Sequence, residues 1–189
     1  MLPTLRTTAW VLAALILVAA EPVRASGADD FVVLTVSGEV SNPNRGPVDS
    51  FDDGILMALE ERFEKARTFA YGDLLALPQD DLVLKYPNWP REIRFRGPRL
   101  ADILDVAGAT GDMVMVQALD GYAPSFERSK LEKAQVILAL NADGRPIPLG
   151  GRGPLWLVFP KGALADGDAV EDDTGLVWAV FHIKVTNED

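Results

Sequence analysis

The chain has 189 residues, of which 18 are Lys or Arg and 28 are Asp or Glu, so its formal net charge is −10 at pH 7. So negative a surface repels the phosphates of nucleic acids and anionic lipid headgroups, which disfavours a nucleic-acid-binding protein. The sequence has no cysteine, and this excludes disulfides, thiolate ligation of a metal, c-type haem attachment and a cysteine nucleophile.

The first 25 residues predict a secretory signal peptide. Met1–Arg6 supplies a positively charged start, and Ala9–Ala20 is a short apolar run. Val23 and Ala25 then occupy the −3 and −1 positions of a cut after Ala25, which is the usual cleavage pattern. The apolar run is shorter than the roughly 20 residues of a membrane span, although an uncleaved anchor is the alternative. We therefore expect a single exported domain, residues 26–189, located in the periplasm.

The first half of this domain predicts two strands with two helices between them. A strand over Phe31–Val40 is rich in β-branched residues and ends in a turn. The stretch Phe51–Ala66 carries apolar residues at helical spacing, with an acidic outer face, and predicts a helix. A short helix over residues 70–78 stops at its proline, and residues 81–87 alternate as a strand.

The second half adds mostly strands. Residues 97–109 predict a helix closed by Gly108, residues 113–119 a buried strand, and residues 134–149 two strands joined by a turn at Asp143-Gly144. Residues 153–160 and 175–187 predict two further strands, of which the last carries the single histidine, His182, expected on an edge strand. Many strands with few short helices indicate an α+β fold dominated by sheet.

Seven segments in this order carry a resemblance to a known family. Together they resemble the molybdopterin-binding fold of the sulfite-oxidase family over nearly the whole mature domain, which implies a mostly β sulfite-oxidase-like fold in residues 26–189. The segments are LTVSGEV, GDLLALP, FRGPRLADIL, ALDGY, VILALNADGRPI, RGPLWLVFP and IKV.

The resemblance also implies a change of chemistry. Enzymes of that family hold molybdenum through a dithiolene pterin and one protein thiolate, yet residues 86–98, YPNWPREIRFRGP, contain no sulfur. Arginine, asparagine or tryptophan cannot replace a soft thiolate. The chain is therefore more similar to the short, cysteine-free, exported branch of PruR-type regulators. These bind a free reduced pterin and regulate a membrane-bound cyclic-di-GMP enzyme. The branch often has an Asn-Asp-Tyr turn where this chain has Asp120-Gly121-Tyr122.

A pterin site needs an acceptor for the N–H groups of the ring edge and a flat group for stacking. Asp120 follows the strand at 113–119 and is the candidate carboxylate, with an Asx-turn as the alternative role. Tyr122 is a candidate ring or hydroxyl, with a place in the core as its alternative. Trp89, between two prolines, is the candidate stacking platform unless it caps the edge of the core.

Candidate donors follow from arginine and glycine positions. Arg94 and Arg96 share one face of an alternating segment, so both are candidates for one pocket, with solvated surface positions as the alternative. Arg152 and Gly153 lie in a glycine-rich loop that offers backbone N–H groups, unless the glycines only turn the chain. Trp156 and Trp178 are expected in the core.

Three functions stay open from the sequence. The first is a non-enzymatic periplasmic sensor that binds a reduced pterin without molybdenum and acts on a membrane-bound signalling partner, such as a cyclic-di-GMP cyclase or phosphodiesterase. The second is a molybdopterin-dependent oxidoreductase with an atypical metal site. The third is a partner-binding protein whose pocket has decayed. His182 alone supplies too few ligands for a zinc or haem site.

Overall fold

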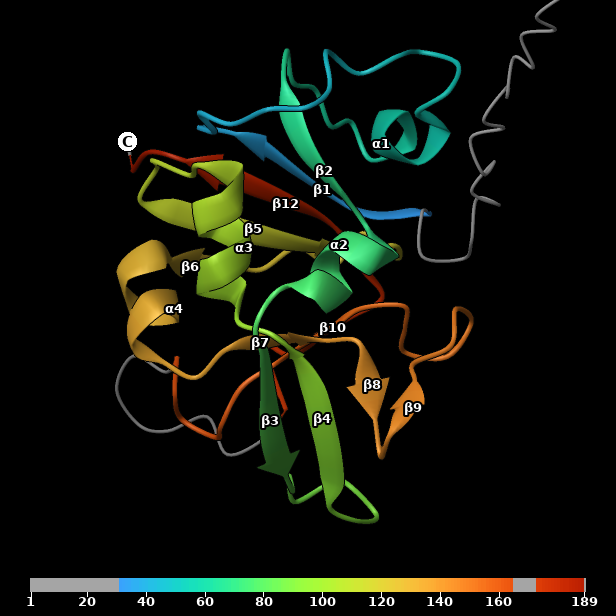
Figure 1. Cartoon of the computed structure of the whole chain (residues 1–189), viewed down its shortest axis with the longest axis vertical. Coiled ribbons are helices and arrows are strands. Elements are labelled where there is room, and N and C mark those ends of the chain that lie inside the picture. The colour runs from blue at the N-terminus through green and yellow to red at the C-terminus, as the bar shows by residue number, and fades with distance from the viewer. Residues whose placement is uncertain (1–30, 165–172, 189) are drawn as a thin grey trace, which may run out of the picture.

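The computed structural model describes residues 31–164 and 173–188. The signal peptide predicted at residues 1–25 lies outside this part of the chain. Within the described residues, no helix combines the length and the apolar character that a membrane span requires. The short helices and numerous strands confirm the predicted mostly β, α+β fold (Figure 1).

The largest sheet has five strands in the order β2-β1-β12-β5-β6 (Figure 1). Strands β1 and β12 run parallel, whereas the other pairs are antiparallel. The first and last strands of the described chain, β1 and β12, therefore lie side by side in the interior of this sheet. Leu34 to Ser37 of β1 are all buried, as expected for a strand covered on both faces. The strands are β1 (Val32–Gly38), β2 (Ala66–Ala70), β5 (Met113–Ala118), β6 (Ser125–Glu127) and β12 (Val180–Thr186).

Two smaller sheets and four short helices complete the described architecture. One sheet has the order β11-β10-β7 and the other the order β3-β4-β8-β9. Their strands are β3 (Gln79–Leu84), β4 (Ile93–Pro98), β7 (Ile137–Ala139), β8 (Asn141–Ala142), β9 (Arg145–Pro146), β10 (Trp156–Val158) and β11 (Val177–Trp178). The helices are α1 (Gly54–Ala58), α2 (Tyr71–Ala76), α3 (Leu100–Ala107) and α4 (Arg128–Lys133).

Local patterns placed α3 and the β8–β9 hairpin correctly. The apolar side of α3, including Leu100, Ile103 and Leu104, is buried, and Gly108 ends the helix with a left-handed φ of 64°. Asp143 and Gly144 of the hairpin turn both have positive φ, 51° and 74°, as a two-residue turn between antiparallel strands requires.

The long helix predicted over Phe51–Ala66 is wrong, because α1 ends at Ala58. Glu60 adopts a φ of 60°, and the chain then turns inward. Glu61 is buried and accepts a hydrogen bond from Nζ of Lys184 on β12, 3.0 Å away. This contact with a residue far along the sequence replaces the second half of the predicted helix.

His182 is not on an edge strand, because β12 pairs with β1 on one side and β5 on the other. The imidazole is fully buried. Its Nδ1 lies 2.9 Å from Oε1 of Gln117 and its Nε2 lies 2.8 Å from Oγ of Ser37. Burial lowers the pKa of His182 to about 4, so the ring is neutral at pH 7, with Nδ1–H donating to Gln117.

A cluster of aromatic side chains fills the core beneath β10. Trp89 packs against Tyr86, Trp156 and Phe95 with ring centroids 5.0, 5.6 and 5.9 Å away. The hydroxyl of Tyr86 donates to the carbonyl of Phe159 at 2.8 Å, and burial raises the pKa of Tyr86 to about 12. Tilted and edge-on ring contacts of this kind add about 0.5–1.5 kcal/mol per pair beyond area burial.

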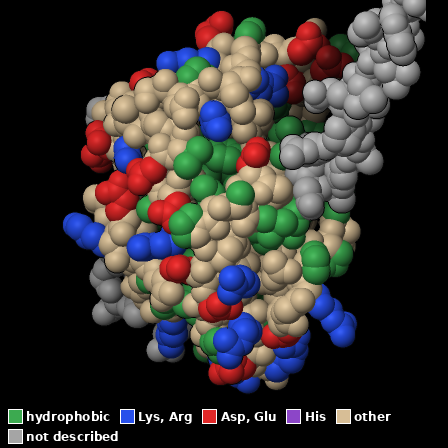
Figure 2. All heavy atoms as spheres, viewed as in Figure 1, with side chains coloured by type: hydrophobic (Ala, Val, Ile, Leu, Met, Phe, Trp, Pro, Cys, Tyr) green, Lys and Arg blue, Asp and Glu red, His purple; other side chains and the backbone are tan. Residues whose placement is uncertain are grey.

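The surface bears charges of both signs. Figure 2 shows acidic and basic side chains interspersed over the face viewed, with hydrophobic side chains gathered near its middle. Several of the exposed apolar residues belong to the start of β1 and to the loop before β10, namely Phe31, Val32 and Leu149.

Candidate functional site

A cavity of about 320 Å³ lies where three segments of the chain meet. The turn after β5 provides one wall, the loop that leads into β10 provides the second, and the residues before and within β11 provide the third. The charged and aromatic residues that line this cavity are Asp120, Tyr122, Arg152, Trp156, Asp173 and Trp178. Three of the residues predicted from the sequence, Asp120, Tyr122 and Arg152, are thus brought together.

Local backbone contacts fix the turn that carries Asp120. Its Oδ1 accepts a hydrogen bond from the backbone N–H of Tyr122 at 3.0 Å, which is the Asx-turn considered as its alternative role. The carbonyl of Tyr122 accepts from the N–H of Ala118 at 2.8 Å, and Gly121 has a φ of 91°. Asp120 therefore makes the turn and also lines the cavity.

The loop between β9 and β10 holds Arg152 over an aromatic ring. The carbonyl of Arg152 accepts from the N–H of Ala179 at 2.9 Å, which ties the loop to the junction of β11 and β12. Its guanidinium carbon lies 4.7 Å from the ring centroid of Trp156, within the range of a cation–π contact. Gly153 is buried, and a Cβ there would lie 2.0 Å from the carbonyl oxygen of Ile147, so only glycine fits.

Trp156 supplies a buried donor without a partner. The residue is 4% exposed and lines the cavity, and its Nε1–H makes no hydrogen bond within the described part of the protein. A buried, unsatisfied N–H costs about 1–3 kcal/mol, so native proteins seldom retain one without a reason. An acceptor atom in the cavity would remove this cost.

Asp173 supplies a carboxylate that the protein already orients. Its Oδ2 accepts from Nε1 of Trp89 at 3.0 Å, and its Oδ1 accepts from Nδ2 of Asn88 at 2.8 Å. The indole hydrogen bond is the main cause that holds the pKa of Asp173 below its usual range, with smaller contributions from Asn88 and from the charge of Arg152. Asp173 is therefore anionic at neutral pH.

Sequence reasoning missed Asp173, Trp156 and Trp178 as site residues. Both tryptophans were expected in the core. Trp178 is instead 42% exposed at the cavity, while Trp156 is buried but still lines it. No local sequence pattern indicates Asp173, because its place in the site depends on a hydrogen bond from the indole of Trp89, 84 positions earlier.

The prediction that Trp89 offers a stacking face does not agree with its burial. Its side chain is 5% exposed and lies within the aromatic cluster. Trp89 instead supports the cavity from beneath, since it packs on Trp156 and donates to Asp173. The exposed rings at the cavity are those of Tyr122, 44% exposed, and Trp178.

Arg94 and Arg96 lie apart from the cavity. Both are exposed on β4, on either side of the buried Phe95, so they share one face of the strand. Arg96 forms an ion pair with Asp81 of β3 at 2.8 Å. The backbone N–H of Arg94 donates to the carboxylate of Asp143 at 3.0 Å. Neither arginine lines the cavity, because both lie on the face of β4 opposite Phe95, whose ring packs on Trp156 of β10.

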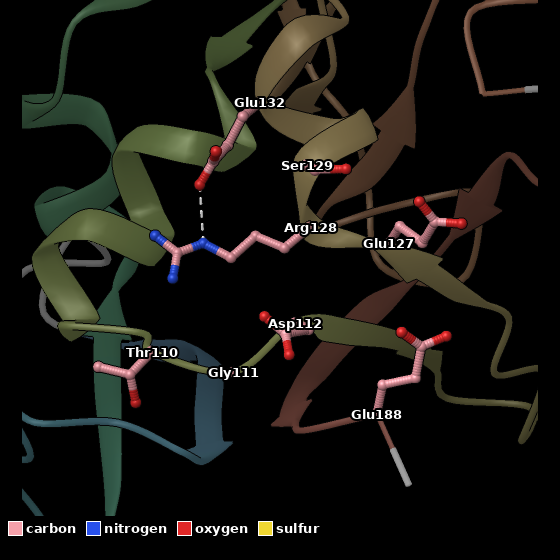
Figure 3. Close-up of a pocket in the computed structure, with 8 residues that line it drawn as sticks. All are labelled: Thr110, Gly111, Asp112, Glu127, Arg128, Ser129, Glu132 and Glu188. Atoms are coloured by element: carbon pink, nitrogen blue, oxygen red, sulfur yellow. Dashed lines mark ion pairs between the residues drawn. The ribbon is translucent and has the colours of Figure 1, made fainter.

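A larger cleft of about 470 Å³ lies between the end of α3 and α4. Figure 3 shows its charged side chains, which are carboxylates apart from Arg128. The guanidinium of Arg128 is occupied, because its Nε lies 2.8 Å from the carboxylate of Glu132 and its terminal nitrogen lies 3.7 Å from Asp105. With no aromatic lining residue and a strongly acidic wall, this cleft does not suit a flat heterocycle.

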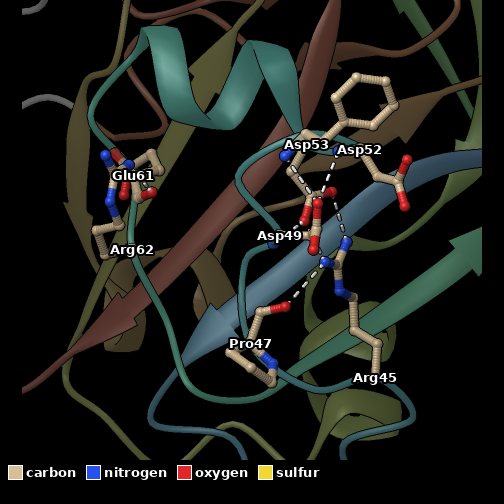
Figure 4. A network of polar contacts seen from close by, with 8 residues as sticks. Arg45, Pro47, Asp49, Asp52, Asp53, Glu61 and Arg62 are labelled. Carbon is tan, nitrogen blue, oxygen red and sulfur yellow. Dashed lines mark hydrogen bonds and ion pairs between the residues drawn. The ribbon is translucent and has the colours of Figure 1, made fainter.

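A separate cluster of polar side chains, distant from the cavity and the cleft in sequence, stabilises the segment before α1 (Figure 4). Arg45 donates to both oxygens of Asp53 at 3.1 and 2.5 Å, a bidentate geometry. The Arg45 hydrogen bond is the main cause that lowers the pKa of Asp53. The guanidinium also lies 5.2 Å from the ring centroid of Phe63. These contacts fix a loop outside the cavity, so the cluster is structural.

Comparison with known families agrees with this architecture. The family model described as the oxidoreductase molybdopterin-binding domain matches residues 45–165, which is well over half of the chain. The protein therefore belongs to the oxidoreductase molybdopterin-binding domain family. The match includes the turn at Asp120 and the loop at Arg152. No curated protein matches the sequence.

The residues at the cavity fit the organic part of a molybdopterin better than its metal. The unpartnered N–H of Trp156 and the anchored carboxylate of Asp173 suit a heterocycle with acceptor and donor groups along one edge. The protein thiolate that holds molybdenum in related enzymes has no counterpart, because the 189 residues include no cysteine. The lining therefore offers hydrogen-bonding groups of the kind that a pterin ring would need, and the sequence supplies no cysteine thiolate as a metal ligand.

Proposed function

We propose that this protein is a periplasmic, non-enzymatic pterin sensor that acts on a membrane-bound signalling protein, such as a cyclic-di-GMP cyclase or phosphodiesterase. The observation that carries the proposal is the cavity that joins Asp120, Arg152 and the buried, unpartnered N–H of Trp156 in a chain without cysteine. Membership of the molybdopterin-binding domain family supports a pterin as the ligand. The absence of cysteine from the sequence supports binding of that pterin without molybdenum.

The cavity offers what a reduced pterin requires. Its volume of about 320 Å³ lies at the lower end of the range for small-molecule sites, about 300–1,000 Å³, and a bicyclic ring is a small ligand. Tyr122 and Trp178 present partly exposed rings for stacking. Asp120 and Asp173 are acceptors for ring N–H groups, and the guanidinium of Arg152 suits an oxygen-rich substituent.

A sensor needs a surface that differs between its loaded and empty forms, because a ligand shifts a partner only through differential binding. The turn at Asp120 and the loop at Arg152 touch the cavity and also reach the surface, where Asp120, Tyr122 and Arg152 are exposed. These two segments are the part of the protein through which a bound pterin would change what a partner contacts.

Ligand titration tests the binding half of the proposal. The mature chain, residues 26–189, is titrated with tetrahydropterin or dihydropterin under anaerobic conditions, and heat release is recorded. Arg152→Ala is expected to weaken binding about tenfold or more, because it removes a charged donor. Arg94→Ala is the matched control, since Arg94 is an exposed arginine outside the cavity, and it should bind like the parent. Absence of binding by the parent chain would overturn the proposal.

A cellular measurement tests the signalling half. In the organism that encodes the protein, deletion of the gene should change the level of cyclic-di-GMP. A copy with Arg152→Ala should behave like the deletion, whereas Arg94→Ala should restore the parent level. An unchanged level after deletion would refute this signalling role. If instead Arg152→Ala restores the parent level fully, the protein acts on its partner without a ligand.

Family membership favours one alternative, a molybdopterin-dependent oxidoreductase with an atypical metal site. That alternative requires a ligand other than cysteine and predicts stoichiometric molybdenum in the purified protein. Elemental analysis separates the two functions directly.

A further inference from the structure

Trp156, Trp89 and Asp173 form a connected unit at the floor of the cavity. The rings of Trp89 and Trp156 pack with their centroids 5.6 Å apart, and Nε1 of Trp89 donates to Oδ2 of Asp173 at 3.0 Å. Because Trp89 touches both, it fixes the positions of Trp156 and Asp173 relative to each other. Trp89 therefore links Trp156 and Asp173, both of which line the cavity.

Each of the two groups has hydrogen-bonding capacity left. The Nε1–H of Trp156 has no partner within the described residues. Each carboxylate oxygen of Asp173 accepts one side-chain hydrogen bond, and a carboxylate has about four lone-pair positions. A ligand that supplies an acceptor to Trp156 and donors to Asp173 would satisfy both at once.

On the basis of the proposed function, we infer that Trp156 and Asp173 recognise the 2-amino-4-oxo edge of a pterin and make the site selective against 2,4-diaminopteridines. The 4-oxo group accepts from the indole N–H of Trp156, while the N3–H and the 2-amino group donate to the carboxylate of Asp173. A 4-amino group instead places a donor against the indole donor, and the unprotonated N3 places a lone pair against the carboxylate.

Asp173 suits this role better than Asp120. The side chain of Asp120 lies at an exposed position, and its Oδ1 is used by the turn. Asp173 is only partly exposed and is held by two side-chain donors, Asn88 and Trp89. A fixed acceptor loses less entropy when it binds a ligand. Asp120 would therefore contact the periphery of the ligand and not its 2-amino-4-oxo edge.

The test compares two ligands on the mature chain, 6-methylpterin and 2,4-diamino-6-methylpteridine, by calorimetric titration in mildly alkaline buffer that keeps the diamino ring neutral. The parent chain should bind the 4-oxo ligand about 10-fold to 100-fold more tightly, since the 4-amino ligand leaves buried polar groups unpaired. Trp156→Phe removes the N–H and should lower that preference by about tenfold. Trp178→Phe, the same change at a stacking wall of the cavity, should weaken binding of both ligands alike and so keep the preference.

If Trp156→Phe fails to fold, benzothienylalanine at position 156 keeps the shape of the indole and removes only its N–H. Asp173→Asn should weaken binding of the 4-oxo ligand about tenfold or more, because it removes the charged acceptor. Equal affinity for the two ligands, or a preference that survives in the Trp156 variants, would overturn this inference while the proposed function stands. Binding of neither ligand would overturn the proposed function itself.

Discussion

The buried imidazole of His182 makes a quantitative prediction about stability and pH. Its pKa falls from 6.5 to about 4 because burial disfavours the charged form. One pKa unit corresponds to about 1.36 kcal/mol, so the difference corresponds to about 3 kcal/mol. Since the folded pKa lies below the unfolded one, this stabilisation is complete above pH 6.5. It is lost as the pH falls toward 4.

The groups that face the imidazole set this behaviour. Ser37 and Gln117 bind the neutral ring, while the nearby charge of Glu61 acts to raise its pKa and that of Lys184 acts to lower it. The expected result is a fall of about 3 kcal/mol in the free energy of unfolding between pH 6.5 and pH 4, beyond what the carboxylates contribute.

Urea unfolding across this pH range provides the assay, with His182→Gln as the reference variant. The variant keeps a neutral polar group but has no imidazole, and it keeps every carboxylate, so the difference in unfolding free energy between parent and variant isolates the imidazole. That difference should shrink as the pH falls from 6.5 to 4. A difference that stays constant with pH would refute the assignment of a neutral, buried imidazole.

Three further predictions concern the loops. Gly153→Ala places a Cβ 2.0 Å from the carbonyl oxygen of Ile147, so we expect a loss of about 1–3 kcal/mol in thermal or urea unfolding together with weaker pterin binding; an unchanged Tm would contradict the packing of this loop. Asp53→Asn breaks the bidentate pair with Arg45 and should cost about 1 kcal/mol, with a smaller cost in high salt; equal costs at low and high salt would argue against an electrostatic role. Asp120→Ala should weaken pterin binding about tenfold by titration, and full affinity would remove Asp120 from the site.

Sequence reasoning succeeded where structure follows from neighbouring residues. The Asp143-Gly144 turn requires positive φ at two positions, which these residue types tolerate. Helix α3 combines a buried apolar side with a terminal glycine. Both signals span only a few residues, so no distant contact was needed to interpret them. The same holds for β5, in which five of the six residues are apolar, with Gln117 as the exception.

The failures have a common physical cause, which is tertiary contact. Helix α1 stops early because Glu61 pairs with Lys184, 123 positions away in the chain. His182 is central rather than at an edge because β1 pairs in parallel with β12. Neither partner is visible in a local pattern. Tertiary contacts of this kind override the intrinsic preference of a segment.

The kinds of residue that form the candidate site were easier to predict from the sequence than the particular residues that form it. The sequence indicated that an acceptor, a flat ring and arginine donors were required, and Asp120, Tyr122 and Arg152 do line one cavity. The arginines of β4 do not, because they lie on the face of the strand opposite Phe95, the face that packs on β10. Asp173 was missed since its role depends on Trp89, which lies 84 positions earlier. A buried donor such as that of Trp156 is recognised only once its surroundings are known.

The pterin and molybdenum content of the protein as isolated tests the central claim most directly. The mature chain is purified from a bacterium that makes molybdopterin, then denatured, and the released fluorescent pterin and the metal are quantified in the same sample. We expect pterin in an amount close to that of the protein and almost no molybdenum. Molybdenum in a stoichiometric amount, or no pterin at all, would contradict the account.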